Sequence, residues 1–151
     1  MSNAEQGAVS FRPMTRSDTR AVLALARKAA IVGGHLSDKD MAATDPGGPL
    51  DLSFIAEVDG KAIGFLLARL AYLMIPFTEV CLLQGILIDP DYQEHGIGSK
   101  LLRELLDYCQ SEGINTIRAL VEQHNDELRR FLERLGFRSS NIINYDKTFE
   151  S

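Results

Sequence analysis

Cysteine is scarce in this chain of 151 residues, which contains only Cys81 and Cys109. Both lie in apolar runs, and neither has other metal-ligating residues around it at the spacing of a metal site. We therefore expect two buried, reduced thiols. This pattern argues against a disulfide framework, and we expect no metal.

Long hydrophobic runs are also missing. The longest apolar stretch, residues 62–77, is interrupted by Arg69 and Pro76. It falls short of the roughly 20 residues that a membrane-spanning helix needs. The N-terminus lacks the basic patch and apolar run of a secretory signal. We therefore expect a cytoplasmic protein without a membrane partner.

Positive charge is in short supply, because 16 Lys and Arg stand against 21 Asp and Glu and the net charge is -5. This balance argues against a nucleic-acid partner, which would need basic residues against its phosphates. Between residues 36 and 60, Lys39 is the only base. The stretch suggests either a cationic substrate or simply a solvated acidic loop. Its acids are Asp38, Asp40, Asp45, Asp51, Glu57 and Asp59.

The length is that of one ordinary domain with a core of its own. We expect a single domain over residues 8–151, preceded by a disordered tail or tag remnant over 1–7. Hydrophobic periods of two and of 3.6 residues alternate along the chain and predict a mixed α/β (α+β) fold. Strands are expected at 9–14, 54–58, 62–73, 80–88 and 117–121, with closing strands at Phe137 and 141–149. Helices are expected from Thr15 to Gly33-Gly34, after Ser37, over 96–111 and from Asn125 to Gly136.

One segment indicates a binding function. The apolar strand ending at Ile88 leads into a loop, and Gly96 and Gly98 then open an amphipathic helix. The first N–H groups of a helix have no partner within it and carry the positive end of its dipole, so they favour an anion. Glycine lets the backbone approach a phosphate closely. We therefore expect a ligand that carries phosphate.

Three phosphate loops compete for this segment. A dinucleotide fingerprint needs GxGxxG, but Leu101 stands where the third glycine belongs. A nucleotide-triphosphate loop needs a final GK(S/T), which is absent. The third pattern, a strand followed by QxxGxG, matches residues 93–98.

With this pattern the chain resembles the GNAT (Gcn5-related N-acetyltransferase) family. The run IDPDYQEHGIGSKLL is similar to its acetyl-coenzyme A signature, and HNDELRRFLERLGF to its later asparagine, helix and Gly-Phe element. The resemblance covers residues 10–149. It implies a mostly antiparallel, twisted sheet that is splayed between its fourth and fifth strands and flanked by about four helices.

The resemblance implies an N-acetyltransferase that takes acetyl-coenzyme A (acetyl-CoA) and an amine acceptor, without an acyl-enzyme. Strand main-chain groups would pair with the pantetheine arm, and the loop would wrap the pyrophosphate. Asn125 would contact the pantetheine arm, or it is a plain helix N-cap, or both. Because family members often pair through their last strands, a homodimer is also suggested. The implied cofactor-binding residues are Ile86, Leu87, Ile88, Gln93, Glu94, His95, Gly96, Ile97, Gly98, Ser99 and Asn125.

The chain departs from the family at the usual proton donor. Many members have a tyrosine four residues before the glycine of the Gly-Phe element, where this chain has Leu132. Tyr145 and Glu122 are the candidate catalytic residues in its place. Alternatives are His124, Glu79, Gln84 or a water relay.

A second departure lies in the loop, where Glu94 and His95 stand at positions that are frequently basic in the family. A carboxylate facing a pyrophosphate would be repelled, so we expect Glu94 to point outward. Charge pairing would then come from Lys100 or Arg103. Two rival functions stay open, a non-catalytic acyl-CoA-binding regulatory module and a transferase for a longer acyl chain.

Overall fold

The computed structural model describes residues 7–29, 36–93 and 95–150. They form two compact units, Met1–Leu120 and Val121–Ser151, which we describe separately. Apart from Gly7, the expected N-terminal tail lies outside the described residues, and so does the expected helix stop at Gly33-Gly34. The single domain over 8–151 stays a prediction.

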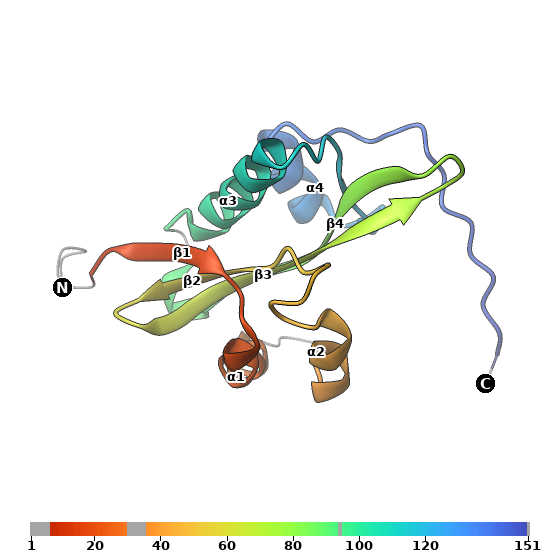
Figure 1. Ribbon diagram of the computed structural model, residues 1–151. Coiled ribbons are helices and arrows are strands. Elements are labelled where there is room, and N and C mark those ends of the chain that lie inside the picture. Colours follow the sequence, from red (N-terminus) through yellow and green to blue (C-terminus); the bar gives the residue numbers. More distant parts are fainter. Residues whose placement is uncertain (1–6, 30–35, 94, 151) are drawn as a thin grey trace. The chain divides into compact units, whose positions relative to one another are not determined.

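The first unit is built on a five-stranded sheet (Figure 1). The first four strands are antiparallel neighbours, and the fifth joins the fourth in parallel. This mixed sheet confirms the α/β fold expected from the alternating hydrophobic periods. In spatial order the strands are β1 (Val9–Pro13), β2 (Phe54–Val58), β3 (Lys61–Leu73), β4 (Thr78–Ile88) and β5 (Ile117–Ala119).

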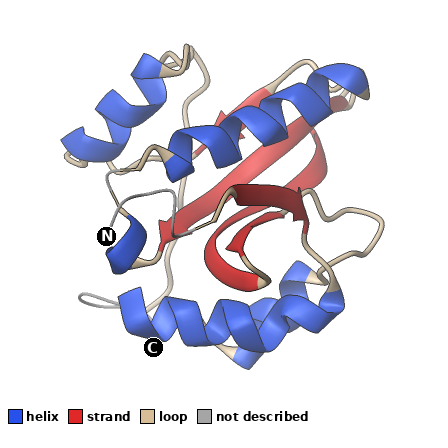
Figure 2. Ribbon diagram, turned by 90° about the vertical axis from the view of Figure 1, so that its left-hand side faces the viewer, coloured by secondary structure: helices blue, strands red, loops and turns tan. Residues whose placement is uncertain are grey.

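Helices cover both faces of this sheet, as Figures 1 and 2 show. Side chains alternate between the two faces of a strand. Phe65 and Leu67 of β3 therefore share one face, where they join a buried cluster with Val22 and Met41 from the first two helices. Leu66 points to the opposite face and is fully buried. The helical elements are η2 (Arg16–Asp18), α1 (Thr19–Ala29), α2 (Asp38–Thr44), η3 (Pro90–Tyr92) and α3 (Ile97–Ser111).

Asp59-Gly60 forms the turn between β2 and β3, as an Asp-Gly pair between two strand-forming runs favours. Val58 pairs with Lys61, which leaves Asp59 and Gly60 as the two turn residues. Their φ angles are 50° and 79°, as a two-residue hairpin turn that matches the strand twist requires. The turn starts the pairing of β2 with β3, and the register then shifts by one residue, because Glu57 pairs with Ala62 but Ala56 pairs with Gly64.

An ion-pair network joins β1 to η2 and β2. The guanidinium of Arg12 donates to both carboxylate oxygens of Asp18, at 2.8 and 2.7 Å, and to Glu57 at 3.0 Å. Asp18 also accepts the Thr15 backbone N–H at 2.7 Å, as the expected capping box requires. The hydrogen bond from Arg12 lowers the pKa of Asp18, although burial opposes it. The network therefore fixes the start of α1 against the edge of the sheet.

The second unit contains α4 (Asp126–Arg134). Asn125 is its N-cap, with its side-chain oxygen accepting the Leu128 N–H at 3.1 Å. The N-cap role of Asn125 is therefore present, and its contact with pantetheine stays a prediction. Leu132 is the buried residue of this helix.

The expected closing strands at Phe137 and 141–149 are wrong, because neither segment forms a strand. The Phe137 N–H instead donates to the Leu132 carbonyl at 3.0 Å and closes the end of α4. Farther on, the Ile142 N–H donates to Ser140 Oγ and the Asn144 side chain to Asp146. Such local bonds compete with strand pairing, and the adjacent Ile142 and Ile143 break the alternation that would give one apolar face.

In the part of the chain that the structure describes, none of the helices has the length and apolarity to cross a membrane.

We expect Asp18→Asn to lower the free energy of unfolding at pH 7 by about 2 kcal/mol, because it replaces a charge-assisted, partly buried pair. The folded-state pKa of Asp18 is lowered, so its stabilisation is present above the unfolded carboxyl pKa of about 3.9. It is lost as the pH falls through the folded-state value. Urea unfolding from pH 7 to pH 3 checks this.

The matched control is Asp38→Asn, since Asp38 is exposed and makes no ion pair in the described part of the chain. The gap between wild type and Asp18→Asn should narrow below about pH 4. A gap that stays constant with pH would contradict the assigned role of Asp18.

Candidate functional site

The carboxyl-terminal half of β4 has an open edge. β4 pairs with β3 along its whole length, but with β5 only at Cys81–Leu83. From Gln84 to Ile88 the edge that faces away from β3 therefore has no strand partner among the described residues. This is the expected splay between the fourth and fifth strands. Unpaired main-chain groups on such an edge can hydrogen-bond to an extended ligand.

A bulge marks the place where the edge opens. Leu67 pairs with Gly85 but Ala68 pairs with Leu83, so Gln84 is an extra residue on β4. Buried Ser53 supports the facing strand here, accepting the Ala68 N–H at 3.1 Å. Bulges bend a strand and re-aim its groups, and they are common beside active sites. The bulge turns the open part of β4 away from β5.

The amino end of α3 has the features of an anion site. Gly96 is the N-cap, with a left-handed φ of 71° and no side-chain cap. The first bond of the helix runs from the Lys100 N–H to the Gly96 carbonyl at 3.1 Å. Ile97, Gly98 and Ser99 thus present N–H groups without a partner among the described residues, and the helix dipole favours an anion there.

A short turn carries the chain from β4 to this helix. Asp89 accepts the Asp91 N–H at 2.9 Å, and the Gln93 amide donates to the Ile88 carbonyl at 3.4 Å. Among the expected ligand-binding residues, Ile86 to Ile88, Gln93 and His95 to Ser99 therefore form one continuous path from the open edge to α3. Glu94, also expected there, lies outside the described residues.

The carboxylate of Asp89 is nearly inaccessible, at 1% exposure. Lys28 of α1 holds it through an ammonium nitrogen at 3.0 Å, and also contacts Asp91 at 2.8 Å. Burial alone would raise the pKa of Asp89, but the Asp91 N–H and Lys28 together lower it. Asp89 is therefore a charged, fixed point at the start of the loop.

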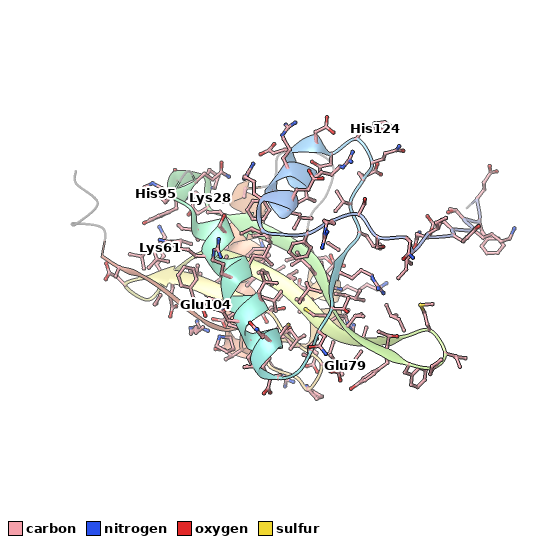
Figure 3. The ribbon with its side chains drawn as sticks, turned by 90° about the horizontal axis from the view of Figure 1, so that it is seen from above. Lys28, Lys61, Glu79, His95, Glu104 and His124 are labelled. Atoms are coloured by element: carbon pink, nitrogen blue, oxygen red, sulfur yellow. The ribbon has the colours of Figure 1, made fainter. Side chains whose placement is uncertain are left out.

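Basic groups gather at this end of the first unit. Lys28, Lys61 and His95 lie around the start of α3 (Figure 3). Lys61 is close enough to Asp89 to help lower its pKa. Lys100, which we expected to pair with a bound phosphate, is exposed on the first turn of α3. Its pairing, and that of Arg103, stay predictions.

The thiol of Cys81 is unsuited to nucleophilic attack. Cys81 and Cys109 are both fully buried and free. A hydrogen bond between them, together with burial, raises the pKa of Cys81 far above its usual range. Since the thiolate is the nucleophilic form, Cys81 is inert.

The candidate proton donors lie far apart in the sequence and are divided between the two units. Tyr145 and Glu122 belong to the second unit, where both are exposed, and their roles stay predictions. Glu79 lies near the tip of the β3–β4 hairpin (Figure 3). Five residue steps along the strand, about 16 Å, lie between Glu79 and Gln84 at the bulge. Gln84, at the bulge itself, is the alternative that β4 brings to the open edge.

Most of the acidic stretch is engaged in local structure. Asp40 caps α2 through Ser37, Asp51 accepts the Gly47 and Ser53 N–H groups, and Glu57 pairs with Arg12. Two of the acids, Asp38 and Asp45, line a surface cavity of about 340 Å³ between η2 and α2, although Asp45 also pairs with Arg16 at 3.3 Å. The stretch is therefore not one acidic patch.

Several features of the site carry no signal in the sequence. The bulge at Gln84 and the contact of Lys28 with Asp89 depend on pairing between distant segments. Pro90 is the one cue in the sequence that could have indicated η3, because proline fits the first position of a helix.

The open edge of β4 leads through a short loop to the uncapped start of α3. A domain with this arrangement can hold a long phosphate-bearing ligand along its backbone. The comparison with protein families identifies which class this is. The acetyltransferase (GNAT) family matches residues 20–137, and the chain belongs to that family.

Relatives agree with this assignment over part of their length. The [ribosomal protein bS18]-alanine N-acetyltransferase of Escherichia coli K12 is 30% identical over 91 residues, which are 60% of this chain and 57% of that protein. An uncharacterized N-acetyltransferase of Methanocaldococcus jannaschii is also 30% identical over 91 residues. The chain matches only 40% of that protein's length.

Solved structures confirm the expected fold. The crystal structure of the ribosomal-protein-S18-alanine N-acetyltransferase from Escherichia coli superposes with a TM-score of 0.75 at 25% identity, covering 89% of this chain and 80% of that one. The aminoglycoside N-acetyltransferase AAC(6')-Iy in complex with CoA superposes with a TM-score of 0.76 at 23% identity, over 93% and 95% of the two chains. The latter likeness shows the fold alone.

We expect Gly96→Ala to weaken CoA binding about tenfold, because a Cβ disfavours the left-handed φ that aims the helix N–H groups. The space around Gly96 is otherwise open, so backbone strain alone would act. Isothermal titration with CoA measures the change.

The matched control is Gly113→Ala at the other end of α3, where φ is 76° and the space is equally open. Both variants should lose about 1 kcal/mol of stability. Equal CoA affinities in the two variants would contradict the role assigned to Gly96.

Proposed function

We propose that this chain is an N-acetyltransferase that moves the acetyl group of acetyl-CoA to a primary amine. The observation that carries the proposal is the open edge of β4 leading directly to the uncapped start of α3. Membership of the acetyltransferase family supports it. A solved structure of the same fold in complex with CoA supports the choice of donor.

The first unit offers a place for each part of the donor. Main-chain groups of Ile86, Leu87 and Ile88 would pair with the pantetheine arm along the open edge. Residues 93–99 would hold the pyrophosphate through their N–H groups, which need no basic side chain. Asn125 of the second unit would contact the pantetheine arm from its place at the head of α4. No metal is required by this chemistry.

The reaction would proceed by direct attack. The neutral amine nitrogen attacks the thioester carbon, the carbon–sulfur bond breaks, and the thiolate and one amine proton leave. Main-chain N–H groups of β4 near the bulge would stabilise the negative charge on the thioester oxygen. Holding both reactants side by side would supply proximity. The burial of Cys81 and Cys109 supports a route without an acyl-enzyme.

A cationic acceptor is the finer part of the proposal. Fewer acids support it than the composition suggested, because Asp40, Asp51 and Glu57 bind other groups of this chain. Asp38, at the cavity between η2 and α2, remains placed to attract an ammonium group, whereas Asp45 there pairs with Arg16, which also lines the cavity. The named relatives act on an alanine of a ribosomal protein or on aminoglycosides. Either a peptide amine or a small cationic amine fits this charge.

Leu132 favours a second candidate function. A buried leucine at the family's usual proton-donor position cannot protonate a leaving thiolate. A non-catalytic acyl-CoA-binding module would need no such donor. A transferase for a longer acyl chain is a further alternative. Assembly as a homodimer and a cytoplasmic location stay predictions.

Thiol release separates the enzyme from the binding module. With acetyl-CoA and a panel of cationic, neutral and anionic amines, we expect CoA thiol to appear only with an amine present, and fastest with cationic amines. Parallel titrations with acetyl-, succinyl- and longer-chain CoA report the acyl preference. Binding of acetyl-CoA without thiol release by any amine would favour the regulatory module.

Tyr145→Phe tests the proton donor. If the tyrosine O–H protonates the leaving thiolate, kcat should fall by about 10²-fold while the KM for acetyl-CoA stays unchanged. Glu122→Gln is the parallel test for a carboxyl group that accepts the amine proton. Steady-state kinetics from pH 6 to 9 checks both. Rates equal to wild type in both variants would leave the alternatives His124, Glu79, Gln84 and a water relay.

A further inference from the structure

Lys28 makes a contact that its position in the sequence does not explain. It lies in the last turn of α1, where a basic residue usually faces the helix carbonyls and solvent. Its ammonium nitrogen instead lies 3.0 Å from the Asp89 carboxylate and 2.8 Å from that of Asp91. The two carboxylates flank Pro90, the first residue of η3. Lys28 therefore ties α1 to both sides of the turn that follows β4.

Asp89 is held from every side. Its N–H donates to the Ile63 carbonyl at 2.8 Å, its carboxylate accepts the Asp91 N–H, and its carbonyl accepts the Tyr92 N–H at 2.8 Å. A carboxylate at 1% exposure needs a cation or strong donors to remain charged. Lys28 is the cation in direct contact with it among the described residues.

We propose that Lys28 is a positioning residue for the pyrophosphate loop. Through Asp89 and Asp91 it fixes the point and direction in which the chain leaves β4. Packing on the sheet fixes α3 itself, so the contact of Lys28 would act on the loop that leads into residues 97–99. The inference rests on the proposed function, because it assigns Lys28 a role toward the same donor site.

The geometry distinguishes this role from two simpler ones. Lys28 is a poorer phosphate ligand than a free lysine, because two carboxylates already neutralise its charge. Its bond to Asp91, a side chain that is 70% exposed, adds little stability by itself. Such a bond can still restrict the turn, because the same ammonium group is anchored to buried Asp89. The contact therefore restrains the loop more than it stabilises the fold.

The test compares Lys28→Met with Arg27→Met and Lys28→Arg. Arg27 is the neighbouring, exposed residue of α1 and makes no ion pair in the described part of the chain. We expect Lys28→Met to weaken CoA binding about tenfold, the effect of one charge-assisted hydrogen bond. Arg27→Met should bind as wild type, and Lys28→Arg should recover most of the loss. Isothermal titration with CoA gives the affinities.

Hydrogen exchange of the free protein supplies a readout without CoA. The N–H groups of Asp89, Asp91 and Tyr92 are hydrogen-bonded, so peptides covering 89–92 should exchange faster in Lys28→Met and not in Arg27→Met. With an active enzyme, KM for acetyl-CoA should rise while kcat changes by less than about twofold. A fold-wide stability role would instead speed exchange throughout the first unit.

The outcomes separate this inference from the proposed function. Wild type that fails to bind CoA would remove the proposed function, and exchange over 89–92 would then decide whether Lys28 fixes the loop. Wild type that binds CoA, with Lys28→Met showing the same affinity and exchange, would overturn the inference alone. Faster exchange and weaker binding confined to Lys28→Met would support both.

Discussion

The candidate ligand site exists because the parallel pairing of β4 with β5 ends at Leu83. A longer ladder would occupy the main-chain groups of Ile86 to Ile88 and leave no edge for a ligand. The bulge at Gln84 turns β4 at this place, and β3 continues to hold its other side down to Ile88. The strand is thus rigid along one edge and open along the other, which is what an extended ligand needs.

Between that edge and α3, the structure of each residue in the loop depends on the residue before it. Asp89 ends β4 in a buried, charged position, and η3 then turns the chain toward α3. Gly96 in the left-handed conformation allows the helix to begin without a side-chain cap. Its first N–H groups therefore stay available for an anion. These donors belong to the backbone, so the acidic composition of the chain does not exclude an anion at this place.

The sequence predicted what depends on local pattern. The hydrophobic periods located β2, β3, β4 and α3 to within about two residues, because burial on one face dictates those periods. Asp59-Gly60 acted through its own φ angles and Asn125 through a side-chain bond to the N–H three residues on, so both signals are local as well. The failures concern segments whose structure depends on partners elsewhere. The closing segment 141–149 has strand-forming residues but local bonds of Ser140 and Asp146 instead, and the contact of Lys28 with Asp89 joins residues that no short-range pattern connects.

The N–H groups at the start of α3 affect which substitutions such a domain can accept during evolution. A backbone donor is contributed by every residue except proline, so most side-chain replacements at Ile97 or Ser99 leave the donor itself in place. Only the left-handed position at Gly96 ties the donors to one residue type. The sequence of the loop can therefore diverge widely while its N–H donors remain in place. A TM-score of 0.75 at 25% identity is the kind of relationship that this freedom permits.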